Sequence, residues 1–323
     1  MTIRIAPNLL ITITAIMIML IGFSSIASSS SSFIQSRAFA NNNNNNVIIL
    51  NFYDNPKSQY TYAKPILDKY GFKASFFVVC NWVGRSNESR MTWHDIDALH
   101  KDGQDIESHT MNHKNLNKLS FDKLNFEIGQ SKKCLLEHNI NATVFAPPHG
   151  DEWNNSTIIS TVAKYYNLAL GGFSKIMYLH CDGWKRFSSQ TDCRTYFDNG
   201  TLTLVNRYSI REWSHNALDQ AYSHNRTKIF EKFVEDVNYQ TKPDIDNHNN
   251  TDERTAMITT TPPTINAISI IGYHSIDNNK TPDSTDVNLF AAEMKYLHDN
   301  RFKVLSMADL GYDQNGNYLY IKQ

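Results

Sequence analysis

Between Val47 and Gly71 the chain reads VIILNFYDNPKSQYTYAKPILDKYG, an apolar run followed by a polar loop and a helix-like segment. Val47–Phe52 is apolar enough for a buried strand. Gln59–Tyr70 is helix-like and stops at Gly71, a residue type that often follows the C-terminus of a helix. The stretch therefore predicts one strand–helix unit with polar residues directly after the strand.

The same alternation continues along the chain. Thr92 and Asp95 have the spacing of a capping box and open a helix that ends at Gly103. Further strands are expected at Ser75–Val79, Asp105–Ser108, Thr143–Phe145, Leu168–Leu170, Ala267–Tyr273 and Lys303–Leu305, and further helices at Ser120–Glu137, Ser156–Tyr166 and Val287–His298. Strands that alternate with helices imply parallel strands and right-handed crossovers. The fold class is therefore α/β, either an open doubly wound sheet or a barrel.

Composition narrows the class of protein. The 323 residues include 31 basic and 32 acidic side chains, and a net charge of −1 argues against a protein that coats nucleic acid. A hydrophobic fraction of 41% is enough for a core. We expect the folded domain at residues 47–323, after an Asn-rich flexible segment at 41–46 and with an irregular surface insertion around 171–264.

Residues 1–40 have the pattern of an export signal. Arg4 provides a positive start, and Leu9–Phe23 is almost wholly apolar but short for a membrane span. Ala38-Phe39-Ala40 follows a Ser-rich stretch and has the small–x–small spacing of a cleavage site. The alternative is an uncleaved membrane anchor with a Ser-rich stalk. Both interpretations place the folded domain outside the cell, either secreted or at the cell surface.

Sequons and cysteines fit an exported protein. Asn-x-Ser/Thr sequons, which indicate a glycoprotein unless they arise by chance in an Asn-rich chain, begin at Asn87, Asn141, Asn154, Asn155, Asn199, Asn225, Asn249 and Asn279. Cys181 and Cys193 lie close together in a loop-like stretch, so we expect a disulfide between them, which leaves Cys80 to pair with Cys134. Free buried thiols are the alternative, since Cys134 falls within a predicted helix.

Candidate metal ligands follow two of the predicted strands. His109 and His113 are spaced i,i+4 directly after Asp105–Ser108, so both imidazoles can reach one cation. Asp54 follows the first strand and would complete a set of one carboxylate and two imidazoles that leaves positions open for water and substrate. Chance pairs are expected among 12 histidines, but a position directly after a strand favours a metal site.

In order and strand context these motifs resemble those of the polysaccharide deacetylases of carbohydrate esterase family four, the NodB homology domain, over residues 47–310. The family motif Thr-Phe-Asp-Asp-Gly reads Asn51-Phe52-Tyr53-Asp54-Asn55 here, and His-Ser/Thr-x-x-His is matched in full by residues 109–113. Arg-x-Pro-Tyr reads Ala146-Pro147-Pro148-His149, and a Leu-x-His-like strand end reads Gly272-Tyr273-His274. The helix start at residues 57–63 is most similar to that of secreted archaeal members. The resemblance implies a distorted (β/α)7 barrel.

The resemblance also implies a chemistry. A divalent ion, zinc in the first place with cobalt, manganese or nickel as alternatives, would be held by the Asp/His/His set and would activate water for attack on an acetyl carbonyl. A backbone N–H near His149 would stabilise the oxyanion, with Pro147 and Pro148 beside the substrate. His274 would protonate the departing amine. A core histidine satisfied by its neighbours is the alternative for His274.

Two departures from the family pattern concern the general base. Tyr53 stands where the family has its base Asp, and a tyrosine pKa of about 10 suits it poorly to accept a proton. Ala146 stands where the family has the Arg that pairs with that Asp, so both partners of one ion pair are missing together. Glu107, His149 and Asp151 are the other candidate bases, the first because strand alternation points it the same way as the first metal-binding histidine.

Aromatic residues could form a platform for a sugar ring, or could simply pack the top of the barrel. The candidates are Trp153, Trp184 and Trp213. Two functions stay open. One is a metal-dependent hydrolase that removes acetyl groups from an N- or O-acetylated polysaccharide, acting on carbon–nitrogen bonds other than peptide bonds. The other is a non-catalytic metal- and glycan-binding protein at the cell surface. A membrane is a partner only if the N-terminal segment is retained.

Overall fold

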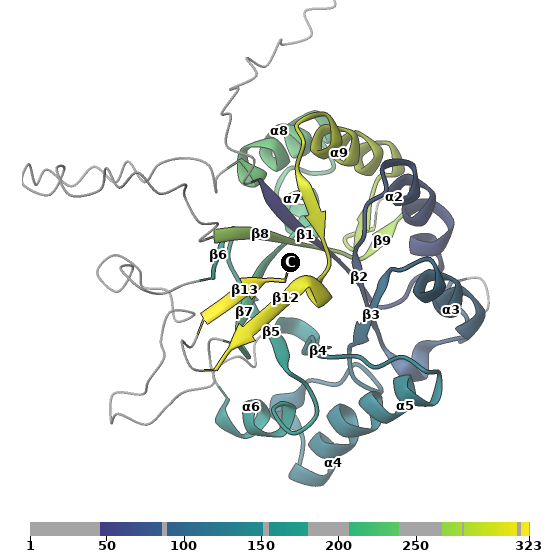
Figure 1. Cartoon of the computed structure of the whole chain (residues 1–323). Coiled ribbons are helices and arrows are strands. Elements are labelled where there is room, and N and C mark those ends of the chain that lie inside the picture. Colours follow the sequence, from purple (N-terminus) through teal and green to yellow (C-terminus); the bar gives the residue numbers. More distant parts are fainter. Residues whose placement is uncertain are drawn as a thin grey trace, which may run out of the picture. The chain divides into compact units, whose positions relative to one another are not determined.

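Seven parallel strands pair in the order β1-β2-β3-β4-β5-β7-β8, and β8 pairs with β1 to close the ring in this computed structural model (Figure 1). They are β1 (Val47–Tyr53), β2 (Ser75–Val78), β3 (Asp105–Ser108), β4 (Val144–Phe145), β5 (Leu168–Phe173), β7 (Ile210–Ser214) and β8 (Ala267–Tyr273). The predicted (β/α)7 barrel is therefore confirmed, and the open sheet is not the fold.

The structure describes residues 46–85, 89–150, 155–179, 207–238, 267–279, 281–314 and 318–322, all within the unit Asn43–Gln323. The predictions for the export signal, for most of the Asn-rich segment and for the Cys181–Cys193 disulfide lie outside these residues. The same is true of Asp151, Trp153 and Trp184.

Helices surround the ring of strands (Figure 1). They are α2 (Lys64–Tyr70), α3 (Trp93–Lys101), α4 (Phe121–Asn125), α5 (Ser131–Glu137), α6 (Ser156–Val162), α7 (His215–Ala221), α8 (Arg226–Val237) and α9 (Val287–Asp299). The predicted signals hold: Gly71 is left-handed at φ 68°, and Thr92 and Asp95 form both hydrogen bonds of a capping box. The long helix expected at Ser120–Glu137 is α4 and α5 joined by a π-helical segment.

Six further strands of the described residues lie outside this ring. Strand β11 (Lys303–Leu305) pairs with β1, and β6 (Met177–Tyr178) pairs with β8. Two separate two-stranded sheets are formed by β9 (Ser275–Ile276) with β10 (Ser284–Thr285) and by β12 (Leu310–Asp313) with β13 (Tyr318–Ile321). The region expected as an irregular insertion also contributes β7, α7 and α8 to the barrel itself. Strand β7 escaped prediction because Arg211 and Glu212 interrupt its short apolar run.

Strand alternation divides the buried residues into two clusters. Ile48, Leu50 and Phe52 of β1 pack outward with residues of the helices, whereas Val47, Ile49 and Tyr53 belong to a cluster built mainly from the inward faces of the strands. The same two-residue period turns Glu212 inward and Trp213 outward on β7. The side chains that face each other across the barrel are thereby fixed by register.

A disulfide joins Cys80, directly after β2, to Cys134 on α5. This confirms the pairing expected from the sequence for these two residues. Backbone N–H groups of Cys80 and Asn81 donate to the carbonyls of Thr110 and Met111, so the bridge lies beside the histidine loop after β3.

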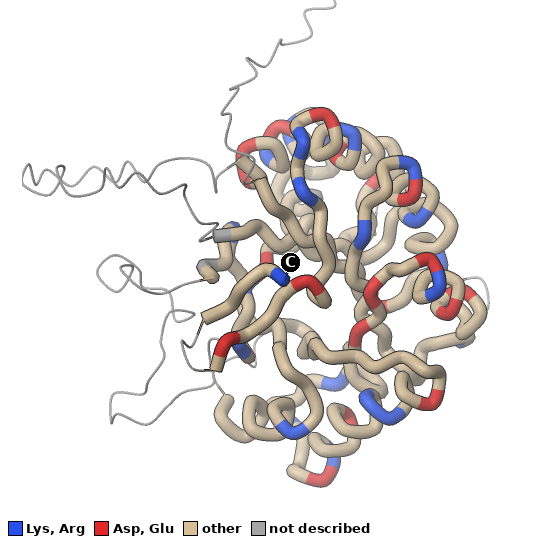
Figure 2. The backbone as a smooth tube through the Cα atoms, viewed as in Figure 1, with Lys and Arg blue, Asp and Glu red and all other residues tan. Residues whose placement is uncertain are grey.

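Basic and acidic residues are interspersed along the outer helices in the described part of the chain (Figure 2). Within the described residues, no helix combines the length and apolar character needed to cross a membrane.

Candidate active site

Asp54, His109 and His113 converge at the carboxyl end of the barrel, as the sequence predicted. Each offers one ligand atom, and these atoms all lie within 4.8 Å of one another. The Nε2 atoms of His109 and His113 lie 3.5 and 3.3 Å from Oδ1 of Asp54. Asp54 extends from the end of β1 and both histidines follow β3, so the topology of the barrel brings the three together.

The chemistry of the set fits a divalent cation. Nδ1 of His109 lies 2.7 Å from the carbonyl oxygen of Ala146 and donates to it, which leaves the lone pair of Nε2 directed at the site. Burial lowers the pKa of His109 to about 4, and burial also lowers the pKa of His113, so both rings are neutral as ligands must be. Oδ1 of Asp54 is buried without a hydrogen-bond donor among the described residues, an arrangement that a bound cation would satisfy.

The loop that carries Asp54 is held in an unusual backbone conformation. Asp54 and Asn55 have φ values of 69° and 43°, in the left-handed region that side chains other than glycine adopt only at a cost. Nη1 of Arg90 donates to the Asp54 carbonyl over 2.5 Å, and Oδ1 of Asn55 accepts from the N–H of Val79 over 3.0 Å. Arg90 was not identified from the sequence, because its role depends on an approach between segments that no local motif reports.

The histidine loop is held in a similar way. Thr110 and His113 have φ values of 70° and 56°, and the N–H of His113 donates to Oγ1 of Thr110. The buried carboxylate of Glu127 accepts from the N–H groups of Met111 and Asn112. These bonds hold the backbone of the loop that carries His113.

At the position of the family's base, the hydroxyl of Tyr53 donates to Oε2 of Glu212 over 2.6 Å. Nδ2 of Asn51 donates to the same Glu212 oxygen over 2.9 Å. A Cβ at Gly272 would lie 3.0 Å from the Tyr53 ring and 3.3 Å from the Glu212 carboxylate, so the absence of a side chain there makes room for the pair. The missing Asp–Arg ion pair is thus replaced by a Tyr–Glu hydrogen bond from a different strand.

Burial sets the protonation of this pair. Burial, reinforced by the nearby Glu212 carboxylate, raises the pKa of Tyr53 well above its usual value, so the phenol stays protonated. Burial also raises the pKa of Glu212 to about 7, against the lowering effect of its bonds to Tyr53 and Asn51. Like Arg90, Glu212 was not identified from the sequence. The alternation of β7 about Trp213 was the available signal.

Two further predicted histidines stand around the three ligands. The His274 ring lies 5.5 Å from that of Tyr53, and its Nδ1 is buried with no hydrogen-bond partner among the described residues. His149 is exposed, and its ring lies 5.0 Å from the His113 ring. Pro147 and Pro148, which precede it, are both buried.

Glu107 lies within the barrel, but its carboxylate hydrogen-bonds to residues at the start of β4. Its carboxylate accepts from the N–H of Val144 over 2.8 Å and from Oγ1 of Thr143 over 3.2 Å. Burial and the nearby Asp105 raise the pKa of Glu107 well above its usual value. These contacts tie β3 to the start of β4 and show no bond from Glu107 to the three ligands.

Trp213 does not lie beside the site, where we expected it to contact a substrate, but on the outward side of β7. It is only 6% exposed, its indole N–H donates to Oγ of Ser269, and its ring packs near Phe233 of α8. Because successive side chains of a strand alternate, the inward position on β7 is taken by Glu212. Aromatic side chains nearer the site are Trp82, whose ring lies 4.9 Å from the His113 ring, and Phe173, which is 57% exposed beside the His149–Gly150 turn.

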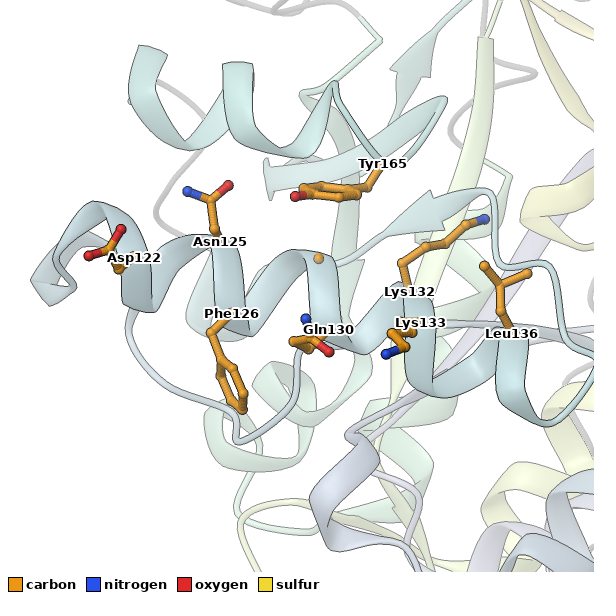
Figure 3. A pocket seen from close by; sticks show the side chains of 9 residues that line it. Asp122, Asn125, Phe126, Gln130, Lys132, Lys133, Leu136 and Tyr165 are labelled. Carbon is orange, nitrogen blue, oxygen red and sulfur yellow. The ribbon is translucent and has the colours of Figure 1, made fainter.

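A hollow of about 580 Å³ opens on the outer helices (Figure 3). It is lined by Leu136 of α5, by Phe126 of the π-helical segment before α5, and by Tyr165, which follows α6. None of the predicted site residues lines it, so it is separate from the Asp/His/His set.

Comparison with known proteins supports the resemblance. Residues 40–169 match the family model for polysaccharide deacetylase. The chain is 28% identical over 125 residues to "Putative polysaccharide deacetylase YxkH" of Bacillus subtilis (strain 168), covering 38% of this chain and 43% of that protein. It is 31% identical over 87 residues to the uncharacterized protein YlxY of the same strain. This match covers 27% of this chain and 25% of that protein. The matches thus span less than half the length of these curated relatives.

Solved structures similar to this chain include peptidoglycan deacetylase PdaC from Bacillus subtilis, with 16% identity, coverage of 81% of this chain and 88% of that chain, and a TM-score of 0.46. A family 4 carbohydrate esterase from Streptomyces lividans is 12% identical, with a TM-score of 0.46. The match covers 86% of this chain and 98% of that chain. A BA3943 mutant, described as a CE4 family pseudoenzyme with restored enzymatic activity, has 13% identity, coverage of 82% and 67%, and a TM-score of 0.47.

The closed ring of seven parallel strands with outer helices is the (β/α)7 barrel of the family-four deacetylases. The family-model match covers residues 40–169, and over these residues the chain is similar to polysaccharide deacetylases.

Proposed function

We propose that this chain is a metal-dependent hydrolase that removes acetyl groups from an N- or O-acetylated polysaccharide outside the cell. The observation that carries the proposal is the convergence of Asp54, His109 and His113, with a buried Asp54 oxygen that lacks a donor among the described residues. A bound divalent ion would supply Lewis-acid activation of water and of the acetyl carbonyl.

The chain's own residues would do the rest. Ala146 holds the tautomer of His109 through its carbonyl, and the Arg90 bond holds the backbone of Asp54. His274, with one ring nitrogen unpartnered among the described residues, would protonate the departing amine. Trp82 and Phe173 offer aromatic faces beside the site on which a sugar ring could pack.

A second function is favoured by a specific observation. The hydroxyl of Tyr53 is committed to Glu212 and stays protonated, so the family's base position holds a hydrogen-bond donor. A protein that binds a metal and a glycan at the cell surface without hydrolysing the glycan would need no base there.

Action outside the cell is part of the proposal. It is supported by the signal pattern of residues 1–40 and by the disulfide between Cys80 and Cys134, since disulfides persist in oxidising compartments.

Metal analysis of the purified protein, combined with acetate release from N- and O-acetylated oligosaccharides, tests the proposal. We expect one divalent ion per chain and ion-dependent release, both lost in His109→Ala/His113→Ala. The matched control His94→Ala removes an exposed histidine of α3 and should change neither. Stoichiometric ion that survives the double substitution would show that the ligands are elsewhere.

A further inference from the structure

We propose that His149 is a fourth protein ligand of the ion held by Asp54, His109 and His113. This inference rests on the metal-binding part of the proposed function. His149 stands where the resembled family has a tyrosine, so the chain offers an additional imidazole at the mouth of the site.

The His149 ring lies about as far from the His113 ring as the His113 ring lies from the His109 ring. The rings of His109 and His113 have centres 4.9 Å apart at 70°, and those of His113 and His149 have centres 5.0 Å apart at 76°. Two imidazoles bound at about 2.0–2.1 Å on neighbouring positions of a tetrahedral ion have ring centres about 5 Å apart. The separation of the His113 and His149 rings is therefore compatible with two imidazole ligands of one ion.

His149 can move the remaining distance. It is exposed and lies outside the set whose ligand atoms are within 4.8 Å of one another, so its ring must rotate toward the ion. Exposed side chains change rotamer within nanoseconds. His149 and Gly150 have φ values of 69° and 72°, and the absence of a side chain at Gly150 leaves room for the Phe173 ring, which a Cβ there would meet at 2.8 Å. This turn brings the His149 ring next to the His113 ring.

A third imidazole changes which ion the site prefers and how open it is. Nitrogen ligands favour zinc, cobalt and nickel over manganese or magnesium, which prefer oxygen. Four protein ligands also close a tetrahedral coordination sphere that a catalytic zinc site leaves open for water. His149 would then compete with water and substrate for the fourth position.

The test is a titration of metal-free protein with Co²⁺ alone, followed by visible absorption and by competition with a chromogenic chelator. The variants are His149→Gly, which suits the left-handed φ, and His149→Ala, with His94→Ala as the matched control. We expect both His149 variants to bind Co²⁺ at least tenfold more weakly, since loss of a supporting partner alone costs about 10–100-fold. We also expect their absorption bands to weaken and shift, and His94→Ala to match the wild type.

Unchanged affinity and spectrum in His149→Gly would overturn the inference while leaving the three-ligand site intact. Unchanged affinity with loss of acetate release would likewise reject it and assign His149 to proton transfer. If the wild type itself binds no Co²⁺, the metal-binding part of the proposed function fails together with this inference.

Discussion

At the scale of single residues, Tyr53 decides what the site can do. The family's base would face the ion from this position, with an Arg at the position of Ala146 to pair with it. Here the phenol donates to Glu212, and Ala146 contributes only its backbone carbonyl, to His109. The three candidate ligands match the resembled family, whereas the charge pair beside them is exchanged for a neutral donor and a carboxylate with a raised pKa.

Restoring the family pair should raise activity. We expect Tyr53→Asp/Ala146→Arg to increase the turnover number for acetate release, because general-base catalysis is typically worth about 10²–10⁴-fold. Tyr53→Asp alone should gain less, since the new carboxylate would stand near Asp54 and Glu212 without a cation, which raises its pKa. Steady-state acetate release with equal ion loading measures both.

A wild type already as fast as ordinary family members would contradict this expectation. Another residue would then be the base, and Glu212→Gln and His149→Gly are the variants to measure next.

Glu212 should also make the stability of the protein depend on pH. Its pKa is raised by folding from 4.5 to about 7, so its contribution to the free energy of unfolding is fully present below pH 4.5 and is lost as pH rises through 7. We expect the fall in melting temperature between pH 5 and pH 8 to be smaller in Glu212→Gln than in the wild type. Glu137→Gln, at an exposed position of α5, is the control. An equal fall in all three proteins would show that Glu212 is already ionised at pH 5.

At the scale of elements, local signals predicted most of the structure. Gly71 and the Thr92–Asp95 box act within one helix end, so the sequence alone locates them. Asp54, His109 and His113 were predictable because each follows a strand, and parallel strands end at one edge. Glu212, Arg90 and Glu127 were not, since each acts on a residue brought close only by the closed barrel.

The Cys80–Cys134 disulfide should stabilise the region around the loop that carries His109 and His113. It closes a loop with a sequence separation of 54, for which chain entropy gives about 4 kcal/mol. We expect Cys80→Ser/Cys134→Ser to lower the free energy of unfolding by about 2–4 kcal/mol and to weaken ion binding through the adjacent histidine loop. Denaturant unfolding and ion affinity measure the two effects. Lys133→Ala, at an exposed position beside Cys134, is the control, and an unchanged unfolding midpoint in the double variant would be the contrary result.

At the scale of the whole molecule, the barrel gathers inward-facing residues from separate strands at one end. Tyr53 of β1, His109 after β3, Ala146 after β4 and Glu212 of β7 meet because side chains alternate and all seven strands run the same way. The sequence indicated this arrangement through strand–helix alternation. It missed β7 because the strand's inward residue is charged.

We propose that an ion held by Asp54, His109 and His113 would give this chain deacetylase activity. The most direct measurement is the rate of acetate release from an N-acetylated oligosaccharide as metal-free protein is titrated with Zn²⁺. We predict a low rate that rises with bound ion and levels off at one ion per chain. Ion binding with no acetate released from any N- or O-acetylated glycan, at any ion loading, by either the wild type or Tyr53→Asp/Ala146→Arg would contradict deacetylase activity at this site.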